Sequence, residues 1–362
     1  MRNMTPKNDI YRLPAEWELQ DAVMLTWPHA DTDWNVYLPE IEHSMCELVA
    51  AIVPHERVVV ASQVPDVTRA KLREAVGEAL WKQIMVEDVP CNDTWTRDFG
   101  PLTLTCPGRE NVLLDFRFNG WGEKFEADLD NEISHTLYNR GVFRGVMQPH
   151  RDFVLEGGAV ESDGRGTVFT TSQCLLAPHR NEPLSKDEIE KELLRRLMAD
   201  RIVWLNHGRL IGDDTDGHID TIVRVAPDDT LLYIRCTDQT DEHYSDFAQL
   251  EAELRALRTA SGSEYRLIAL PMARQETHDG ERLPATYANF LVINGAVICP
   301  TYDNPPLDEA AFAALGEAFP DRKIIGADAR IIIRQHGSVH CLTMQLPAST
   351  LNMDYFNTHS GL

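Results

Sequence analysis

The residue in this chain best suited to covalent chemistry is a cysteine that directly follows a histidine, at His340-Cys341. It stands after a Gly-Ser turn and before a run of residues typical of a β-strand. A thiol at the start of a strand can serve as a nucleophile, although most free cysteines are small buried hydrophobic residues. This stretch alone favours the second interpretation, so the rest of the chain has to supply the evidence for the first.

Carboxylates and a second histidine stand in four further motifs. These motifs are Trp95-Thr96-Arg97-Asp98-Phe99-Gly100-Pro101, Leu155-Glu156-Gly157-Gly158, Asp213-Asp214-Thr215-Asp216-Gly217-His218-Ile219-Asp220 and Tyr287-Ala288-Asn289. Each motif also has a plainer explanation. Asp98 beside Arg97 is by default a local ion pair, and Gly157-Gly158 reads as a turn that needs positive φ. The third motif resembles a calcium loop only loosely, because the acidic spacing and the terminal glutamate are missing.

Taken together, these side chains suit a planar guanidinium. Asp98 and Asp220 can hold its nitrogens in forked geometry, each charged hydrogen bond contributing about 1.5–3 kcal/mol. The guanidinium carbon is a poor electrophile, which favours a soft nucleophile such as Cys341 over water. A free thiol is mostly protonated at neutral pH, and a bound cation would favour its thiolate, whereas the empty acidic pocket opposes it. His218 can protonate the departing ammonia and activate water, with Glu156 orienting the imidazole.

The motifs occur at corresponding points of a repeated pattern of strand, strand, helix and strand. The four complete units are expected at 101–105, 111–117, 125–139 and 142–147; at 159–161, 167–171, 186–198 and 201–205; at 219–225, 231–235, 244–258 and 265–270; and at 287–293, 296–299, 307–318 and 323–325. A fifth unit begins at 341–346, and the N-terminal region completes it with a strand at 22–27, a helix at 34–52 and a strand at 57–61. A second helix is expected at 67–81.

This pattern predicts an α/β fold, a five-bladed propeller of strand-strand-helix-strand units closed by the N-terminal segment, in one catalytic domain spanning 1–362. Paired strands outnumber helices, which argues against a doubly wound parallel sheet. Equivalent positions of a ring face one end of its axis, so the separate motifs are expected to converge on one pocket. Residues 174–185 and 274–284 are long loops that either cover this pocket or are plain solvated loops.

Composition narrows the partners and the compartment. The net charge of −23 argues against nucleic acid and suits a small cation, although solubility alone would explain it equally well. Seven scattered cysteines without a CxxC pair suit the reducing cytoplasm. Residues 1–7 lack the apolar core of a signal peptide, and no apolar run is long enough to cross a membrane. No nucleotide-binding motif occurs, and no second ligand cluster supports zinc at His336, His340 and Cys341, so neither a cofactor nor a metal is expected.

The set of motifs, together with Phe118-Asn119-Gly120-Trp121-Gly122, resembles the agmatine deiminase family over almost the whole chain. That family lies beside the bacterial peptidyl-arginine deiminases among the guanidino-modifying pentein enzymes. The resemblance implies a five-bladed propeller, cysteine attack through an amidino-thioether and no cofactor. It assigns Cys341 as nucleophile, His218 as acid and base, Glu156 as its partner, and Asp98 and Asp220 as guanidinium ligands. It places Trp95 beside the methylene chain of the substrate, and further substrate contacts are predicted for Asn119, Trp121, Thr215 and Asn289.

Departures from the family pattern leave the substrate open. Agmatine deiminases usually read Gly-Gly-Gly-Asn-Ile-His-Cys where this chain has Gln335-His336-Gly337-Ser338-Val339-His340-Cys341, and alanine where it has Gly120. Peptidyl-arginine members carry arginines where this chain has Gly120 and Gly122, unless Arg117 substitutes for them. Hydrolysis of agmatine to N-carbamoylputrescine and ammonia, a step towards putrescine, is therefore expected first. A peptidyl-arginine or other guanidino deiminase, an amidinotransferase and a non-catalytic binding protein are the alternatives, and a homo-oligomer is expected.

Overall fold

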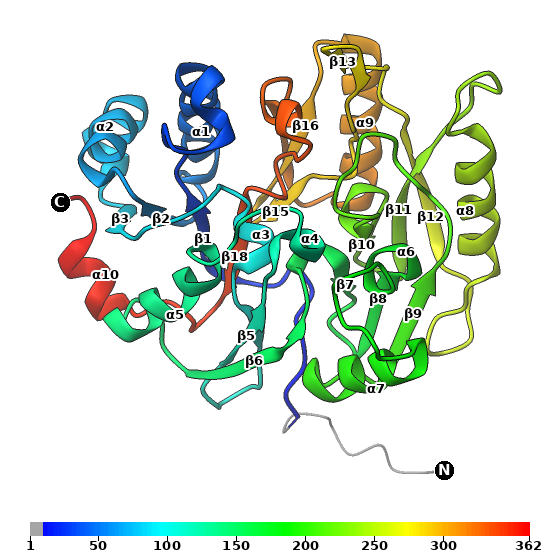
Figure 1. Cartoon of the computed structure of the whole chain (residues 1–362), viewed down its shortest axis with the longest axis horizontal. Coiled ribbons are helices and arrows are strands. Elements are labelled where there is room, and N and C mark those ends of the chain that lie inside the picture. Colours follow the sequence, from blue (N-terminus) through cyan, green and yellow to red (C-terminus); the bar gives the residue numbers. More distant parts are fainter. Residues whose placement is uncertain (1–9) are drawn as a thin grey trace.

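The chain folds into five open, mixed β-sheets with helices packed outside them. The structure is a computed structural model and describes residues 10–362, so the prediction about residues 1–7 lies outside the described part. In Figure 1 the sheets follow one another around the middle of the view in sequence order, with α1, α5, α7, α8 and α9 at the periphery. None of the helices in residues 10–362 is both long and apolar enough to cross a membrane.

Four of the sheets repeat one topology, in which the first two strands are antiparallel and the third is parallel to the second. A helix makes each parallel crossover. The units are β4 (Leu102–Leu104), β5 (Val112–Arg117), α5 (Asp130–Arg140) and β6 (Val146–Val154); β7 (Val160–Ser162), β8 (Thr167–Thr171), α7 (Lys186–Arg196) and β9 (Arg201–Leu205); β10 (Val223–Ala226), β11 (Thr230–Arg235), α8 (Tyr244–Ala256) and β12 (Arg266–Pro271); and β15 (Leu291–Ile293), β16 (Ala296–Thr301), α9 (Pro305–Ala318) and β17 (Lys323–Asp328).

The fifth sheet joins the two ends of the chain. Its strand order is β18-β1-β2-β3, with β18 (Thr343–Pro347) antiparallel to β1 (Gln20–Thr26), so that Met344 lies opposite Met24. The helices α1 (Leu38–Ile52) and α2 (Pro65–Trp81) make the crossovers to β2 (Arg57–Ser62) and β3 (Ile84–Asp88). The predicted pairing of the terminal strands is present. The strand β3 was not predicted, because its five residues are almost continuously buried and lack the alternation that marks a half-exposed strand.

Local backbone geometry moved several predicted boundaries. The helix expected from residue 125 begins at Asp130, because the preceding turn α4 (Gly120–Glu123) has positive φ at Gly120, Trp121 and Gly122 and cannot continue as a regular helix. The strand expected at 142–147 runs instead from Val146 to Val154. The hairpin β13 (Thr277–His278) and β14 (Glu281–Arg282) and the terminal helix α10 (Met353–His359) were not predicted.

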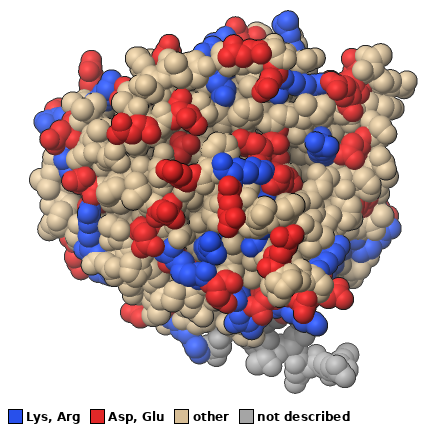
Figure 2. Space-filling model, in the orientation of Figure 1, with Lys and Arg blue, Asp and Glu red and all other residues tan. Residues whose placement is uncertain are grey.

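Short helical turns stand before β4, β7, β10 and β18, and they carry or adjoin four of the motifs found in the sequence. They are α3 (Thr96–Phe99), η2 (Gly157–Ala159), η3 (Ile219–Thr221) and η4 (Ile332–Gln335), and a further turn, η1 (Asp33–Tyr37), follows β1. The turn α3 packs on η2, and η2 packs on η3. Figure 2 shows acidic and basic side chains interspersed over the face of the molecule seen in that view.

Candidate active site

A cavity of about 190 Å³ lies where these turns meet. Its wall combines a thiol, carboxylates and aromatic rings. The lining residues are Asp33, Asp93, Trp95, Asp98, Trp121, Phe125, Asp214, Thr215, Gln335, His336, Gly337 and Cys341. Four of the predicted side chains, Trp95, Asp98, Trp121 and Thr215, therefore line the same space as Cys341. Glu156, His218 and Asp220 are fully buried next to this cavity and Asn289 almost so, which makes them supports of its wall rather than parts of its surface.

Gly158 shows how closely the buried groups converge. A Cβ atom at this position would lie 2.6 Å from His218 Nδ1, 3.0 Å from Asp98 Oδ1 and 3.1 Å from Asp220 Oδ2. At Gly157 a Cβ would lie 2.1 Å from the Arg97 carbonyl oxygen. Neither glycine has positive φ in the structure, so the turn explanation for this pair is wrong. The two glycines are needed because backbone and catalytic side chains approach them too closely for any side chain.

The sulfur of Cys341 is held by the side chain of Asn289. The Asn289 Oδ1 atom lies 3.3 Å from Cys341 Sγ and accepts hydrogen bonds from the backbone N–H groups of His340 and Cys341. Asp220 Oδ2 lies 4.0 Å from the same sulfur. Burial, followed by the negative charges of Asp220 and Asp98, raises the pKa of the Cys341 thiol well above its ordinary value. In the empty site the nucleophile is therefore a thiol, as the sequence predicts.

His218 lies in the opposite electrostatic state. Burial alone would lower its pKa, but the Asp98 carboxylate, the Cys174 sulfur and the Asp220 carboxylate together raise that pKa well above the ordinary value. Its Nδ1 atom lies 3.7 Å from Asp98 Oδ1, and neither ring nitrogen has a hydrogen-bond partner within residues 10–362. A protonated imidazole can donate a proton but cannot accept one, so His218 is set to act first as an acid.

Glu156 makes a contact that the sequence did not predict. Its Oε1 atom accepts a hydrogen bond from Arg180 Nε at 3.0 Å, with both side chains fully buried. Its Oε2 atom has no partner among the described residues and makes no hydrogen bond to His218. Arg180 lies in the segment 174–185, which was considered as a lid, and also donates to Asp216 and to the Thr215 carbonyl. Through Arg180, residues 174–185 thus hold Glu156 and the loop that contains Thr215 and Asp216 in place.

Asp98 and the two tryptophans are fixed by direct contacts. Trp121, which has φ of 56°, donates from Nε1 to Asp98 Oδ2 at 2.9 Å, and the backbone N–H of Gly158 donates to Asp98 Oδ1 at 3.0 Å. Trp95 Nε1 donates to Asp93 Oδ2 at 3.1 Å. A Cβ at residue 337 would lie 2.1 Å from the Trp95 ring, so only glycine allows the cysteine loop to cover this indole.

Two of the residues predicted to contact substrate make hydrogen bonds to other parts of the chain. Asn119 does not line the cavity: its Oδ1 caps α4 at Gly122 N, and its Nδ2 donates to the His179 carbonyl. Asn289 holds the backbone and sulfur of Cys341, as described above. Thr215 does line the cavity, although its hydroxyl donates to Asp213 and accepts from the His218 backbone N–H. Asp213 also accepts from Gly217 N, so this acidic loop is an internally bonded turn that presents His218.

The mouth of the cavity carries three carboxylates, of which only Asp214 belongs to a motif found in the sequence. Asp33, Asp93 and Asp214 line it together with His336, and within residues 10–362 no lysine or arginine does. Burial raises the pKa of Asp93 to about 6, and burial likewise raises that of Asp214 to about 6. His336 adopts φ of 65°, and its Nδ1 lies 2.7 Å from the Gly212 carbonyl oxygen. The hairpin in 274–284 does not line this cavity.

Two groups of potential metal ligands occur within the described residues. Glu156, Cys174 and His218 form one group, and Glu16, Glu161 and His340 form the other, with ligand atoms inside each group within 4.8 Å of one another. In both groups a buried arginine already binds a glutamate: Arg180 binds Glu156, and Arg224 binds Glu16 and Glu161. A guanidinium at these carboxylates is poorly compatible with a second cation, so neither group fits a metal well.

Known proteins were compared with the chain. It matches the profile of the family described as Porphyromonas-type peptidyl-arginine deiminase over residues 12–347. The Pseudomonas aeruginosa agmatine deiminase is 32% identical, with 95% of this chain and 97% of that protein covered. A Porphyromonas gingivalis structure, provisionally named arginine deiminase, is 46% identical with a TM-score of 0.89, covering 95% of this chain and 100% of the other. A substrate-bound cysteine-to-serine agmatine deiminase from C. jejuni is 34% identical with a TM-score of 0.86, covering 97% and 100%. The chain belongs to the family described as Porphyromonas-type peptidyl-arginine deiminase, whose relatives include proteins named agmatine deiminase.

Proposed function

We propose that this member of the family is a hydrolase that deiminates a small guanidino compound, with agmatine as the first candidate. The observation that carries the proposal is the convergence of Asp98, His218 and Asp220 around Gly158, next to the Cys341 sulfur. The solved and curated relatives named agmatine deiminase support the same reaction. The products are the N-carbamoyl amine and ammonia.

Substrate binding would itself activate the nucleophile. The guanidinium is held between Asp98 and Asp220, which is supported by the free Oδ1 of Asp220. These two carboxylates also raise the pKa of Cys341, although burial is the larger cause. A bound cation neutralises the two carboxylates and thereby lowers the pKa of the Cys341 thiol. The thiol then loses its proton to solvent when substrate is present. The site is then matched to guanidinium rather than to a neutral urea.

The covalent steps follow from these positions. The Cys341 thiolate attacks the guanidinium carbon and forms a C–S bond, and His218 gives its proton to the nitrogen that leaves as ammonia. The imidazole, now neutral, takes a proton from water, whose oxygen bonds to the same carbon of the amidino-thioether. The C–S bond then breaks and the hydroxyl proton of this carbon passes to the departing sulfur, which leaves the ureido product and restores the Cys341 thiol. The proton that the thiol released to solvent when substrate bound accounts for the ammonium ion formed overall. The Asp98 carboxylate stabilises the imidazolium before the first transfer and again after the second.

The tail of the substrate is best matched by a second cation. Asp33, Asp93 and Asp214 line the outer cavity without a balancing lysine or arginine in the described chain, which favours an ammonium over the carboxylate of arginine or of a peptide. Trp95, Trp121 and Phe125 supply apolar walls for the methylene groups. His336 lines the same space and is oriented by its Nδ1 atom, which donates to the Gly212 carbonyl.

We also propose that residues 1–362 form one catalytic domain in which the five sheets are the blades of a five-bladed α/β propeller. The pairing of β18 with β1 supports this arrangement, because it ties the last element of the chain to the first. The order of the sheets around the centre of Figure 1 supports it as well. The short turns before the first strands would then all face one end of the axis.

The test is a comparison of substrates with purified protein. Ammonia and ureido product are measured with agmatine, free arginine and an arginyl peptide at equal concentrations. The proposal expects the highest kcat/KM for agmatine. Product from the arginyl peptide but none from agmatine would overturn the substrate assignment, and a requirement for an added amine acceptor would indicate amidino transfer instead of hydrolysis.

A further inference from the structure

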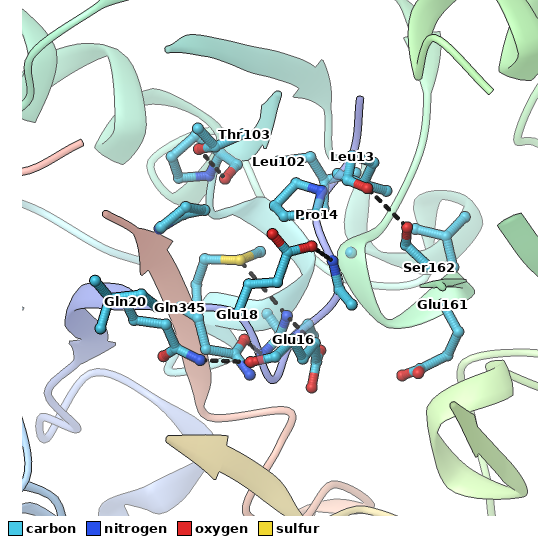
Figure 3. Close-up of a pocket in the computed structure, with 18 residues that line it drawn as sticks. Leu13, Pro14, Glu16, Glu18, Gln20, Leu102, Thr103, Glu161, Ser162 and Gln345 are labelled. Carbon is cyan, nitrogen blue, oxygen red and sulfur yellow. Dashed lines mark hydrogen bonds and ion pairs between the residues drawn. The ribbon is translucent and has the colours of Figure 1, made fainter. Parts of the chain in front are cut away.

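A second cleft lies on the other side of α3 from the active-site cavity. It has a volume of about 70 Å³ and is formed largely by the N-terminal segment, from Leu13 to Gln20. Figure 3 shows Glu16 and Glu18 among the residues that line it. The neighbouring residues Arg97 and Asp98 of α3 separate the two spaces, because Arg97 lines this rear cleft and Asp98 lines the active-site cavity.

His340 connects the rear cleft to the guanidinium ligands. Its Nδ1 lies 2.7 Å from Asp220 Oδ2, and its Nε2 lies 2.7 Å from Glu16 Oε1. The imidazole is fully buried, whereas the Glu16 side chain is 20% exposed at the rear cleft. A continuous chain of short contacts therefore runs from the rear of the molecule to the active site.

The geometry of this chain fixes the orientation of the imidazole. Carboxylate oxygens accept hydrogen bonds, so a His340 nitrogen that bears a proton can donate to Asp220 or to Glu16. Arg224 also places its Nη2 atom 3.1 Å from His340 Nε2. Burial acts to raise the pKa of Glu16 and of Asp220, but the charge of Arg224 beside Glu16 and the hydrogen bond from His340 to Asp220 hold both values below their ordinary range. His340 is thus held between two ionised carboxylates.

Charged side chains surround this imidazole. Arg224 donates to Glu16 and Glu161, and Arg97 lies 3.4 Å from Glu16 Oε1. The charged and titratable groups that face His340 and Asp220 are Glu16, Arg97, Asp98, Glu161, His218, Arg224 and Cys341. Removing one member leaves an uncompensated charge in the wall of the active site.

We propose that His340 and Glu16 are positioning residues for guanidinium binding, with the N-terminal segment holding the ligand Asp220 from behind the active site. His340 occupies Asp220 Oδ2 and leaves Oδ1 without a partner in the described residues. The carboxylate is thereby fixed in one orientation, with one oxygen free for the substrate. Glu16 in turn fixes the imidazole. This inference rests on the proposed deiminase function and adds to it two residues whose side chains act through Asp220 rather than by a bond to the Cys341 sulfur.

The test uses paired variants in the full-length protein. His340→Ala removes the imidazole and its contacts with Asp220 and Glu16. His340→Asn can keep a donor to Asp220. Glu16→Gln removes the carboxylate charge behind the imidazole. Glu18→Gln is the matched control, since Glu18 lines the same cleft but bonds Arg12 and Ala15 N instead. KM and kcat for agmatine are measured across pH, together with the melting temperature.

The expected result is a split between KM and kcat. His340→Ala raises KM about 10- to 100-fold, the loss of one charged hydrogen bond, with a smaller change in kcat. His340→Asn recovers part of the KM, and Glu16→Gln raises it less than His340→Ala does. Losing the imidazole that holds down the pKa of Asp220 raises this pKa, so the acid limb of kcat/KM moves to higher pH in both His340 variants. Glu18→Gln leaves KM and the pH profile unchanged.

Two outcomes would overturn the inference. In the first, KM and the acid limb stay unchanged while the melting temperature falls, which indicates a purely structural network. In the second, Glu18→Gln and Glu16→Gln behave alike.

A binding measurement separates this inference from the proposed reaction. Calorimetric titration of guanidinium chloride into Cys341→Ser, with and without His340→Ala, needs no turnover. If wild-type protein deiminates nothing but the added His340→Ala change still weakens guanidinium binding about tenfold or more, the proposed function fails and the positioning role stands. Equal binding by the two proteins rejects the positioning role whatever the activity.

Discussion

The active site and the rear cleft are both buried clusters of charge, but they differ in how their polar atoms are satisfied. Around the rear cleft Arg224 donates to Glu16, Glu161 and the carbonyls of Ala288 and Phe290. In the active site both nitrogens of His218, Glu156 Oε2 and Asp220 Oδ1 have no partner within residues 10–362. Buried polar groups are normally paired, so unpaired ones mark the place where a ligand belongs.

This difference separates stability from activity. Removing a charge from the paired network of Arg224, Glu16 and Glu161 leaves its partners uncompensated, whereas the unpaired groups of the active site cost stability until substrate arrives. We therefore expect changes near Cys341 to reduce turnover with little effect on folding, and changes at Arg224 to lower the free energy of unfolding. The predictions below can break or sharpen this contrast.

The largest effect is expected from Cys341→Ser. A serine hydroxyl in this environment is not ionised, so turnover of agmatine should fall about 10⁴-fold or more while the unfolding midpoint stays close to wild type. Ammonia release measures the first quantity and thermal unfolding the second. A variant that keeps most of its turnover would contradict the covalent mechanism.

The next effect is expected at the rear cleft, from Arg224→Met. This change strands the buried carboxylates of Glu16 and Glu161 and should cost about 3–5 kcal/mol of unfolding free energy. Urea unfolding with an unchanged m value is the measurement. The matched control is Arg330→Met, whose exposed pairs with Asp303 and Asp328 are worth less than about 1 kcal/mol. Equal destabilisation by the two variants would remove the contrast.

A third effect tests how tightly the catalytic groups converge. In Gly158→Ala the new methyl group would displace His218, Asp98 or Asp220, and a shift of about 1 Å is expected to lower kcat/KM about 100-fold. Gly316→Ala is the control, because the added Cβ meets nothing within 4 Å in α9. That substitution should leave activity unchanged and stabilise the helix by up to about 1 kcal/mol. Full activity of Gly158→Ala would show that the site is looser than described.

The smallest effect concerns the pH dependence of the free thiol. Burial and the two carboxylates raise the pKa of Cys341, so alkylation of the empty enzyme by iodoacetamide should accelerate about tenfold per pH unit through pH ~9, without levelling off near an ordinary thiol pKa. Mass spectrometry of the peptide containing Cys341 follows the rate. A plateau near pH ~7 would show that the resting nucleophile is a thiolate.

The repeat of strand, strand, helix and strand was largely visible in the sequence, because burial patterns and turn residues are local signals. The strands β8 and β9 occur at the predicted residues, and β18 pairs with β1 as expected. The site motifs were visible too, since Trp95 to Pro101 and Asp213 to Asp220 combine residue types that a plain turn does not need. The contacts of Arg180, Cys174 and Glu16 were not, because nothing in their neighbourhoods distinguishes them from surface or core residues.

The sequence by itself therefore determined which residues could do the chemistry and which kind of element carries each of them. Only the tertiary structure decided which side chains contact one another. It places Glu156 against Arg180 rather than His218, and the Oδ1 atom of Asn289 against the sulfur of Cys341. It also joined His340 to Glu16, which is 324 residues away in the chain. The physical reason is that hydrogen-bond partners in a buried cluster depend on distances of a few ångströms between distant segments, and no local pattern encodes those distances.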